Sequence, residues 1–275
     1  MTYGARDLDR TDVVAELRAK LPTVRHVVLL RNLGADASPD LPPDAWFEDT
    51  VARDDAHTDA FEPMWLPFDH PLWIVYSSGT TGLPKPIVHG HGGSLVVALV
   101  LTVLHNDIGC SYDPNSAGER YHWYSSTGWV MWNVQMSGLL NGTTCCIFDG
   151  NPGGSKERPD WTVLWRFAAE LGVSFFGAGA AFFANCAKAG VDLTALPALA
   201  SVRALGSTGS PLSDDAQRWG TTQFARLGVQ DIWWCNISGG TDFAGAFIGG
   251  NRELPQTPGE MQCRLLGCAV EAWDE

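Results

Sequence analysis

Apolar and polar positions beyond residue 70 follow two alternating periods. Short apolar runs such as Leu72–Tyr76 are typical of buried strands, and longer segments with apolar residues every three or four positions predict helices. Repeated strand-then-helix units predict an α/β fold with mostly parallel sheets and flanking helices, which binds ligands at the carboxyl ends of its strands. Strands are expected at 72–76, 119–125, 143–148, 173–176, 201–205 and 229–234. Helices are expected at 94–105, 128–140, 160–171, 178–189 and 213–227. Two short strands of a smaller β subdomain are expected at 261–266 and 269–273.

The first seventy residues are less regular. Asp9–Leu21 has the pattern of an amphipathic helix, which Pro22 ends, and the β-rich run Val24–Leu30 follows. Five prolines between residues 31 and 71 indicate a surface connection with one short helix near 46–52. This part of the chain is therefore expected to contribute one helix–strand unit and a long connecting segment.

The stretch with the clearest chemistry runs from Tyr76 to Lys85, where an apolar strand leads into a hydroxyl-rich glycine loop. Gly79 and Gly82 let backbone amides approach a ligand closely, and Lys85 supplies a positive charge. The hydroxyl donors are Ser77, Ser78, Thr80 and Thr81. The spacing differs from the two commoner nucleotide motifs, Gly-x4-Gly-Lys-Ser/Thr and Gly-x-Gly-x-x-Gly. The loop is predicted to cradle the polyphosphate of ATP; the alternative is a plain turn between a strand and a helix.

Composition narrows the choice of partners. The 275 residues are 45% hydrophobic, which suits a globular domain with a sizeable core, and 18 basic against 31 acidic residues give a net charge of -13. A nucleic-acid surface needs clustered Lys and Arg, so none is expected. A bound polyphosphate must therefore be held locally, by backbone amides, Lys85 and a metal ion.

The cysteine content and the lengths of the apolar runs indicate the cellular compartment in which the protein is expected. The seven cysteines are odd in number and include no Cys-x-x-Cys pair, which argues against a disulfide framework and a zinc site and favours a cytoplasmic location. Cys145 and Cys146 are expected to be unreactive core residues. The longest apolar run, Leu95–Leu104, is shorter than the roughly 20 residues that span a bilayer, so no membrane segment is expected.

From Ser77 to Lys85 the loop matches the pattern Ser/Thr-Ser/Thr-Gly-Ser/Thr-Thr-Gly-x-Pro-Lys-Gly of the adenylate-forming superfamily, which includes acyl-CoA synthetases, luciferases and peptide-synthetase adenylation domains. Only the last glycine differs, because Pro86 stands there. With the segments 126–133, 148–152 and 238–251, the chain most resembles the acetoacetate-CoA ligases. The resemblance implies part of the large N-terminal domain of such an enzyme, which activates acetoacetate with ATP and Mg²⁺ and transfers it to CoA as an acid–thiol ligase.

The resemblance also implies roles for individual residues. Lys85, Thr241 and Asp242 would be catalytic, with Thr241 on the α-phosphate and Asp242 helping to hold Mg²⁺. Trp129, Gly239 and Gly240 would line the acid site. The nucleotide would be bound by Ser77, Ser78, Gly79, Thr80, Thr81 and Gly82, by the adenine-contacting turn Gly206, Ser207, Thr208, Gly209, Ser210 and Pro211, and by Asn236.

Several positions depart from the family or have a second interpretation. Asp242 is one methylene shorter than the usual glutamate, and Ser238 replaces the aromatic residue that stacks on adenine. Gly239 stands where acetate-activating relatives place a tryptophan, which predicts a deeper acid pocket. Trp132 is expected to face the core. His89 and His91 could suggest a metal pair, but we expect His89 to pack and hydrogen-bond behind the phosphate loop.

The family's ribose-binding aspartate, its hinge and its C-terminal domain with the catalytic lysine have no counterpart in these 275 residues. Residues 1–275 are therefore interpreted as a partial AMP-binding (adenylation) domain, a central fragment that is not expected to complete catalysis alone. Two alternatives stay open: an acetyl- or propionyl-type short-chain acyl-CoA synthetase, and a truncated nucleotide-binding protein without catalysis. Oligomeric state is not predicted.

Overall fold

The computed structural model describes residues 2–3, 6–31, 44–77, 82–109 and 118–274. The chain divides into two compact units: unit 1 comprises 1–65 and 154–159, and unit 2 comprises 66–153 and 160–275. Within the described ranges, no helix combines the length and apolar character that crossing a membrane requires.

Unit 1 consists of short elements. α1 (Thr11–Lys20) confirms the first predicted helix, but none of its residues is buried, and the apolar side chain of Leu17 is 51% exposed. The β-rich run at 24–30 contributes only β3 (Val28–Leu29), which pairs in parallel with β4 (Ala45–Trp46). The remaining elements are β1 (Thr2–Tyr3), β2 (Arg6–Asp7), α2 (Phe47–Val51) and α3 (Ala56–Asp59).

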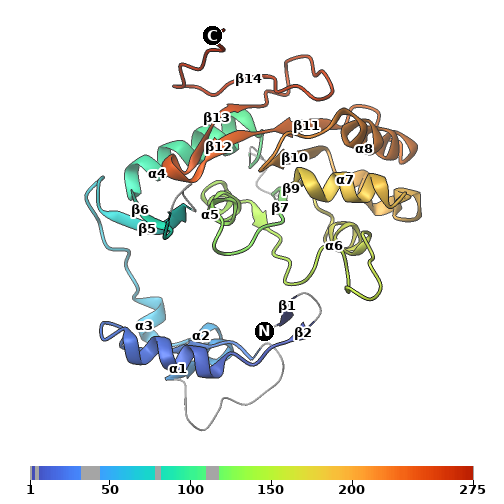
Figure 1. Ribbon diagram of the computed structural model, residues 1–275. Helices are drawn as coiled ribbons and strands as arrows, with labels where there is room; N and C mark the ends of the chain where they lie inside the picture. Colours follow the sequence, from blue (N-terminus) through green and yellow to red (C-terminus); the bar gives the residue numbers. More distant parts are fainter. Residues whose placement is uncertain (1, 4–5, 32–43, 78–81, 110–117, 275) are drawn as a thin grey trace. The chain divides into compact units, whose positions relative to one another are not determined.

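Unit 2 is organised around a five-stranded sheet of order β11-β10-β9-β7-β8, in which every neighbouring pair is parallel (Figure 1). The strands are β7 (Arg120–Trp123), β8 (Thr144–Cys145), β9 (Phe175–Gly179), β10 (Ala204–Thr208) and β11 (Trp233–Asn236). The α-helices are α4 (His91–Leu99), α5 (Val130–Met136), α6 (Val163–Leu171), α7 (Ala180–Lys188) and α8 (Asp214–Arg226). The π-helix η1 (Val100–His105) continues α4, and the 3-10 turns are η2 (Ser137–Asn141), η3 (Leu193–Ala195) and η4 (Pro197–Ser201). The predicted α/β class with a parallel sheet is confirmed.

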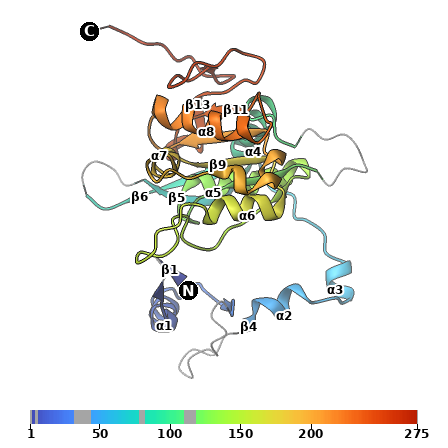
Figure 2. The same ribbon diagram turned by 90° about the vertical axis from the view of Figure 1, so that its right-hand side faces the viewer.

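Helices cover both faces of this sheet, because successive side chains of a strand point to opposite faces. Phe176, Leu205 and Trp234 pack with residues of α6, α7 and α8 in one core. Their neighbours Phe175 and Trp233 pack with residues of η1 and α5 in the other. Figure 1 and Figure 2 show these helices on either side of the central strands. Burial on both faces explains why apolar residues stand at consecutive positions in Phe175–Phe176 and Trp233–Trp234.

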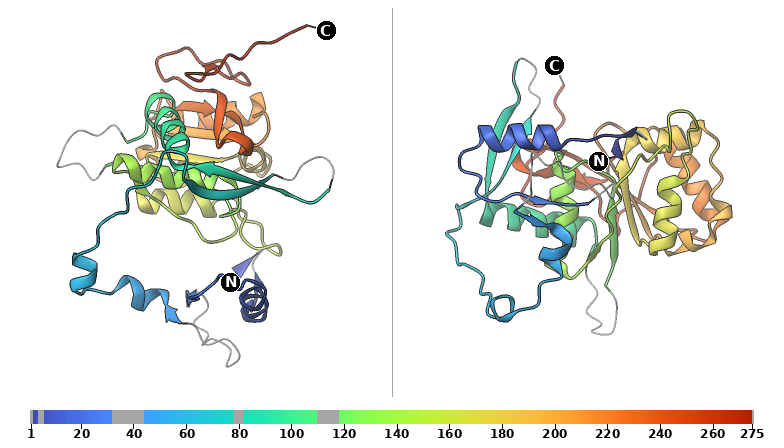
Figure 3. Two further views of the ribbon diagram at one scale, coloured as in Figure 1. Left: turned by 90° about the vertical axis from the view of Figure 1, so that its left-hand side faces the viewer. Right: turned by 90° about the horizontal axis from the view of Figure 1, so that it is seen from below.

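Two smaller β structures complete unit 2. β5 (Pro71–Ser77) and β6 (Lys85–Gly90) form an antiparallel hairpin (Figure 3). β12 (Ser238–Gly240), β13 (Gly245–Gly249) and β14 (Cys263–Arg264) form an antiparallel sheet, with the 3-10 turn η5 (Thr241–Phe243) joining the first two. A second, smaller sheet was predicted and is present, but residues 269–273 contribute no strand to it.

The strands β9 and β10 end later than the sequence indicates. β10 extends to Thr208 although Gly206 favours a turn, because Gly206 is held between Gly177 of β9 and Cys235 of β11 in the parallel ladders. A Cβ on Gly206 would lie 2.4 Å from the Trp123 ring, so glycine at this position lets the indole pack against the sheet. The predicted turn at 205–212 is therefore wrong in its first half.

Two predictions around the hairpin are also corrected. The run at 72–76 was expected to be buried, yet only Val75 of β5 is buried, because β5 pairs with β6 outside the large sheet. The next helix begins at His91 with Gly90 as its N-cap, so Ser94 lies inside the helix and does not cap it. The expected end near His105 is confirmed, although the last turns are a π-helix.

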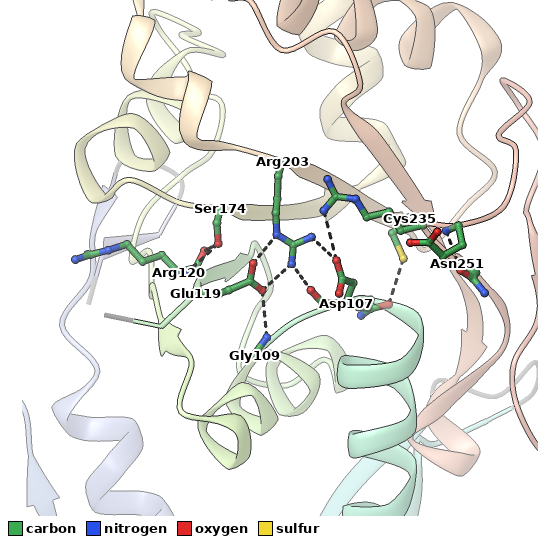
Figure 4. A network of polar contacts seen from close by, with 11 residues as sticks. Asp107, Gly109, Glu119, Arg120, Ser174, Arg203, Cys235 and Asn251 are labelled. Atoms are coloured by element: carbon green, nitrogen blue, oxygen red, sulfur yellow. Dashed lines mark hydrogen bonds and ion pairs between the residues drawn. The ribbon is translucent and has the colours of Figure 1, made fainter. Parts of the chain in front are cut away.

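A network of charges lies at the amino ends of β7 and β10 (Figure 4). Arg203 donates from Nη2 to Oε2 of Glu119 at 2.7 Å and from Nη1 to Oδ2 of Asp107 at 3.1 Å. The backbone N–H of Gly109 donates to the same Glu119 oxygen. The side chains of Arg203 and Glu119 are 23% and 17% exposed, so solvent only partly screens the pair. The network joins two strands to the end of η1 at the edge of the sheet opposite their carboxyl ends.

Candidate functional site

Two adjoining clefts open at the carboxyl ends of β10 and β11, with volumes of about 490 and 540 Å³. The two clefts share Thr208, Gly209, Ile237 and Gly239 as lining residues. The first is otherwise lined by Leu101, Trp129, Val130, Met131, Val134, Gly240, Thr241, Gly245 and Ala246. The second is otherwise lined by Ser210, Pro211, Ser238 and Met261. Because an open α/β sheet binds ligands at this edge, the clefts are the candidate site.

The turn after β10 forms the wall between the clefts. The hydroxyl of Thr208 donates to the carbonyl oxygen of Ile237 at 2.7 Å, which fastens the ends of β10 and β11 to each other. Gly209 has φ +88, a backbone conformation that favours glycine, and turns the chain toward Ser210 and Pro211. The structure thus places four of the six predicted adenine-turn residues at the clefts. Gly206 and Ser207 lie within β10 and line neither.

Asn236, at the end of β11, carries an unpaired acceptor and lines neither cleft itself. Its side chain is buried, and its Nδ2 lies 3.3 Å from the carbonyl oxygen of Glu260 and 3.4 Å from Oε1 of Gln217. Its Oδ1 has no hydrogen-bond partner among the described residues. A buried carbonyl oxygen without a donor costs free energy, which a donor group of a ligand would recover. Ile237 and Ser238, the next two residues, line the second cleft.

Trp129 forms the side of the first cleft. It is the N-cap residue of α5 with extended backbone, so its half-buried indole stands at the start of the helix and not along it. A Cβ on Gly209 would lie 3.7 Å from the Trp129 ring, which places the indole against the wall between the clefts. Trp132 was expected in the core but is only half-buried and belongs to neither described core cluster.

The Thr241–Asp242 turn closes the other side of the first cleft. Thr241 lines the cleft directly. Asp242 is exposed and lines neither cleft; its Oδ2 lies 3.7 Å from the point where a Cβ on Gly240, a lining residue of the first cleft, would be. Ala244, with φ 51, ends this single turn and sends the chain back along β13.

The donor set for a metal ion is small. The described residues contain no group of three or more His, Cys, Asp or Glu side chains that could hold one. Mg²⁺ is commonly bound by one or two carboxylates together with phosphate oxygens of a substrate. Asp242 therefore fits a metal ion that arrives with a nucleotide, and it does not fit a metal site made by protein alone.

Gly239 lines both clefts and cannot carry a side chain in this backbone. A Cβ at this position would lie 2.1 Å from the carbonyl oxygen of Gly245, which precedes Ala246, the partner of Gly239 in the β12–β13 pair. A tryptophan at this position, which the resemblance assigns to acetate-activating relatives, would push β13 away from β12. The predicted deeper pocket stays a prediction.

The predicted phosphate loop is described only at its ends. Ser78, Gly79, Thr80 and Thr81 lie outside the described residues. Ser77, the last residue of β5, is directly opposite Lys85, the first residue of β6, and Gly82 has φ +109. The loop thus joins two antiparallel strands, and not a strand and a helix as the alternative of a plain turn assumed.

Burial disfavours the thiolate form of four of the described cysteines. Burial raises the pKa of Cys145 and Cys146, and it raises the pKa of Cys186 and Cys235 to about 12. A raised pKa leaves little thiolate, the reactive form. Cys146 lies in the core as expected, whereas Cys145 is only partly buried; the raised pKa of both thiols agrees with the expectation that the pair is unreactive.

Some lining residues had no signal in the sequence. Met261 reaches the second cleft from the long connection between β13 and β14, where no motif marks it. Leu101 and Val134 lie in apolar helical runs, so the sequence predicts their burial but not that they face a ligand. Only the packing of η1 and α5 against the sheet selects them.

The chain is similar to known proteins over most of its length. The family model described as "AMP-binding enzyme" matches residues 2–241. Acetoacetyl-CoA synthetase of Danio rerio is 32% identical over 278 residues, which cover 99% of this chain and 39% of that protein. Acetoacetyl-coenzyme A synthetase of Rhizobium meliloti (strain 1021) is 39% identical over 211 residues, which cover 76% of this chain and 30% of that protein.

A solved structure shares the fold. Acetoacetyl-CoA synthetase from Streptomyces lividans superposes with a TM-score of 0.83 and 42% sequence identity, covering 99% of this chain and 39% of that one. The chain thus matches between 30% and 39% of the length of these relatives. The shared fold includes the parallel sheet at whose edge the clefts lie.

Proposed function

This chain belongs to the AMP-binding enzyme family, and from that membership we propose that it carries part of the ATP and acid sites of an acid–thiol ligase. The proposed substrates are acetoacetate, ATP and CoA. Relatives named acetoacetyl-CoA synthetase support the choice of acid. The proposed activity is that of the whole enzyme, of which these residues form the described clefts.

One observation carries the proposal: the two clefts share a wall made by Thr208, Gly209, Ile237 and Gly239. An acyl-adenylate has a base at one end and an acyl group at the other, joined through a phosphate. Such a ligand can place its base by Ser210 and Pro211 and its acyl group by Trp129, with the phosphate passing the shared wall. The unpaired Oδ1 of Asn236 suits the exocyclic amino group of adenine, a hydrogen-bond donor.

The proposed reaction has two steps. A carboxylate oxygen of acetoacetate attacks the α-phosphorus of ATP, the bond from that phosphorus to the bridging oxygen breaks, and pyrophosphate leaves with the electron pair. The sulfur of CoA then attacks the acyl carbon, the bond to the AMP oxygen breaks, and the thiol proton passes to solvent.

The chain's own groups would stabilise charge that develops during these steps. Lys85 would place its ammonium near the phosphates, and Thr241 would donate its hydroxyl to an α-phosphate oxygen. Asp242 would hold Mg²⁺ together with nucleotide oxygens, and the bound ion would neutralise part of the polyphosphate charge. No covalent attachment to the protein is required.

Ligand binding tests the proposal without requiring turnover. Calorimetric titration of the chain with non-hydrolysable acyl-adenylate analogues should give one site, with the acetoacetyl analogue bound more tightly than the acetyl analogue. Lys85→Met should weaken MgATP binding about tenfold, the effect of losing one charged contact. Lys188→Met removes an exposed lysine from the far end of α7 and is the matched control.

The outcomes separate the parts of the proposal. No measurable binding of MgATP or of either analogue would overturn the nucleotide site. Tighter binding of the acetyl analogue would replace acetoacetate by a shorter acid. Equal MgATP binding by Lys85→Met and the unmodified chain would remove Lys85 from the site.

A further inference from the structure

His89 makes two hydrogen bonds that connect distant parts of unit 2. It lies in β6 directly opposite Trp73 of β5, and the indole N–H of Trp73 donates to its Nδ1 at 2.9 Å. On the other side of the ring, Nε2 lies 3.0 Å from the carbonyl oxygen of Asp242, 153 residues later in the chain. The imidazole thus bridges the β5–β6 hairpin and the turn η5.

The two partners select one tautomer of His89. An indole N–H can only donate, so Nδ1 must accept; a backbone carbonyl can only accept, so Nε2 must carry the proton. With both nitrogens engaged, the neutral ring has no lone pair left for a metal ion. The alternative that His89 and His91 form a metal pair has no support among the described residues, where no cluster of three potential ligands occurs.

The bridge joins two parts of the proposed phosphate site. Along the hairpin, the Trp73–His89 pair is four residues from the Ser77–Lys85 pair, about 13 Å at the usual rise of a strand. The phosphate loop extends beyond that second pair. At the other end, holding the peptide of Asp242 sets the direction of its Cα–Cβ bond, and so limits where its carboxylate can lie.

We propose that His89 is a positioning residue that holds Asp242 in register with the hairpin carrying the phosphate loop. The inference rests on the proposed function, since the position of Asp242 affects ligand binding only if the site binds MgATP. His89 itself contacts neither nucleotide nor metal. Its contribution is the hydrogen bond to the Asp242 carbonyl, and Trp73 keeps the ring in the tautomer that can donate it.

Two substitutions separate the two arms of the bridge. His89→Asn places an amide oxygen near the position of Nδ1, so it can keep the Trp73 contact but cannot reach Asp242. His89→Gln places an amide nitrogen near the position of Nε2, so it can restore the donor to Asp242. His89→Asn should weaken MgATP binding about tenfold, as expected for one lost hydrogen bond, and leave binding of metal-free ATP unchanged. His89→Gln should recover binding to within about twofold of the unmodified chain.

A spectroscopic measurement tests the geometry independently of ligands. The ¹⁵N shifts of the imidazole should show a protonated Nε2 and an unprotonated Nδ1 in the unmodified chain. Trp73→Phe should shift the Nδ1 resonance, because Nδ1 loses its donor, and leave Nε2 protonated, because the Asp242 carbonyl still accepts from it. The opposite tautomer in the unmodified chain would overturn the inference.

The binding outcomes distinguish this inference from the proposed function. If the unmodified chain fails to bind MgATP, both are wrong. If it binds MgATP and His89→Asn binds equally well, only the role of His89 is wrong. Equal losses in His89→Asn and His89→Gln, with both variants folded, would also overturn it, because the donor to Asp242 would then not matter.

Discussion

His122 should make the protein sensitive to acid. Its side chain is 1% exposed and packs against Phe167 and Phe176, while Nδ1 lies 2.7 Å from the carbonyl oxygen of Cys146. Nε2 is buried and has no partner among the described residues. Burial disfavours the charged ring and lowers the pKa of His122 from 6.5 to about 4.

The size and sign of the effect follow from this pKa. Above pH 6.5 the ring is neutral in both the folded and the unfolded chain. Between pH 6.5 and about 4, His122 binds a proton in the unfolded chain but stays neutral in the folded chain. The free energy of unfolding therefore falls as the pH falls. At roughly 1.4 kcal/mol per pKa unit, the complete loss is about 3 kcal/mol. Below this window both states are protonated and the loss is complete.

Urea unfolding followed by tryptophan fluorescence measures the effect. His122→Asn keeps a donor for the Cys146 carbonyl but cannot titrate, so its stability should fall by about 3 kcal/mol less than that of the unmodified chain between pH 7.5 and 4. His57→Asn, which replaces an exposed histidine, is the matched control. Parallel curves for His122→Asn and the unmodified chain would refute the reasoning.

Three further substitutions have expected outcomes. Trp129→Ala should weaken binding of the acetoacetyl-adenylate analogue more than that of AMP, because it removes only the side of the first cleft; equal losses in calorimetry would contradict this. Gly177→Ala would place a Cβ 2.1 Å from the Trp123 ring and should lower the free energy of unfolding by about 1–3 kcal/mol, whereas Gly93→Ala, with open space at that position, should not. Arg203→Met should cost roughly 1–3 kcal/mol in urea unfolding, since its half-shielded carboxylate partners lose their counter-ion; an unchanged midpoint would show that the network is unimportant.

Local chemistry explains what could be predicted. The order of the five strands of the parallel sheet and of helices α4 to α8 was predicted from apolar patterns, whereas β6, β12 and β13 were not predicted. Thr208, Gly209 and Thr241 were predicted from motifs, and the structure places all three at the clefts. The second short sheet was also predicted, although not its exact strands.

Strand ends and burial were harder to predict. Gly206 favours a turn by propensity, but pairing on both sides keeps it in β10. Propensity is a local quantity, whereas ladder pairing depends on strands that lie about 30 residues away in the chain. For the same reason, the apolar sequence of β5 suggested burial that its position outside the large sheet does not provide.

The sequence by itself therefore determined the α/β class, the order of the parallel strands with their helices, and the hydroxyl- and glycine-rich motifs, because these depend on periodicity and on residue type. Only the tertiary structure decided which motifs meet: Trp129 against Gly209, Met261 beside the second cleft, and His89 on the carbonyl of Asp242. The physical reason is that such contacts arise from packing helices onto both faces of one sheet. That packing brings together residues more than a hundred positions apart, and no local pattern records it.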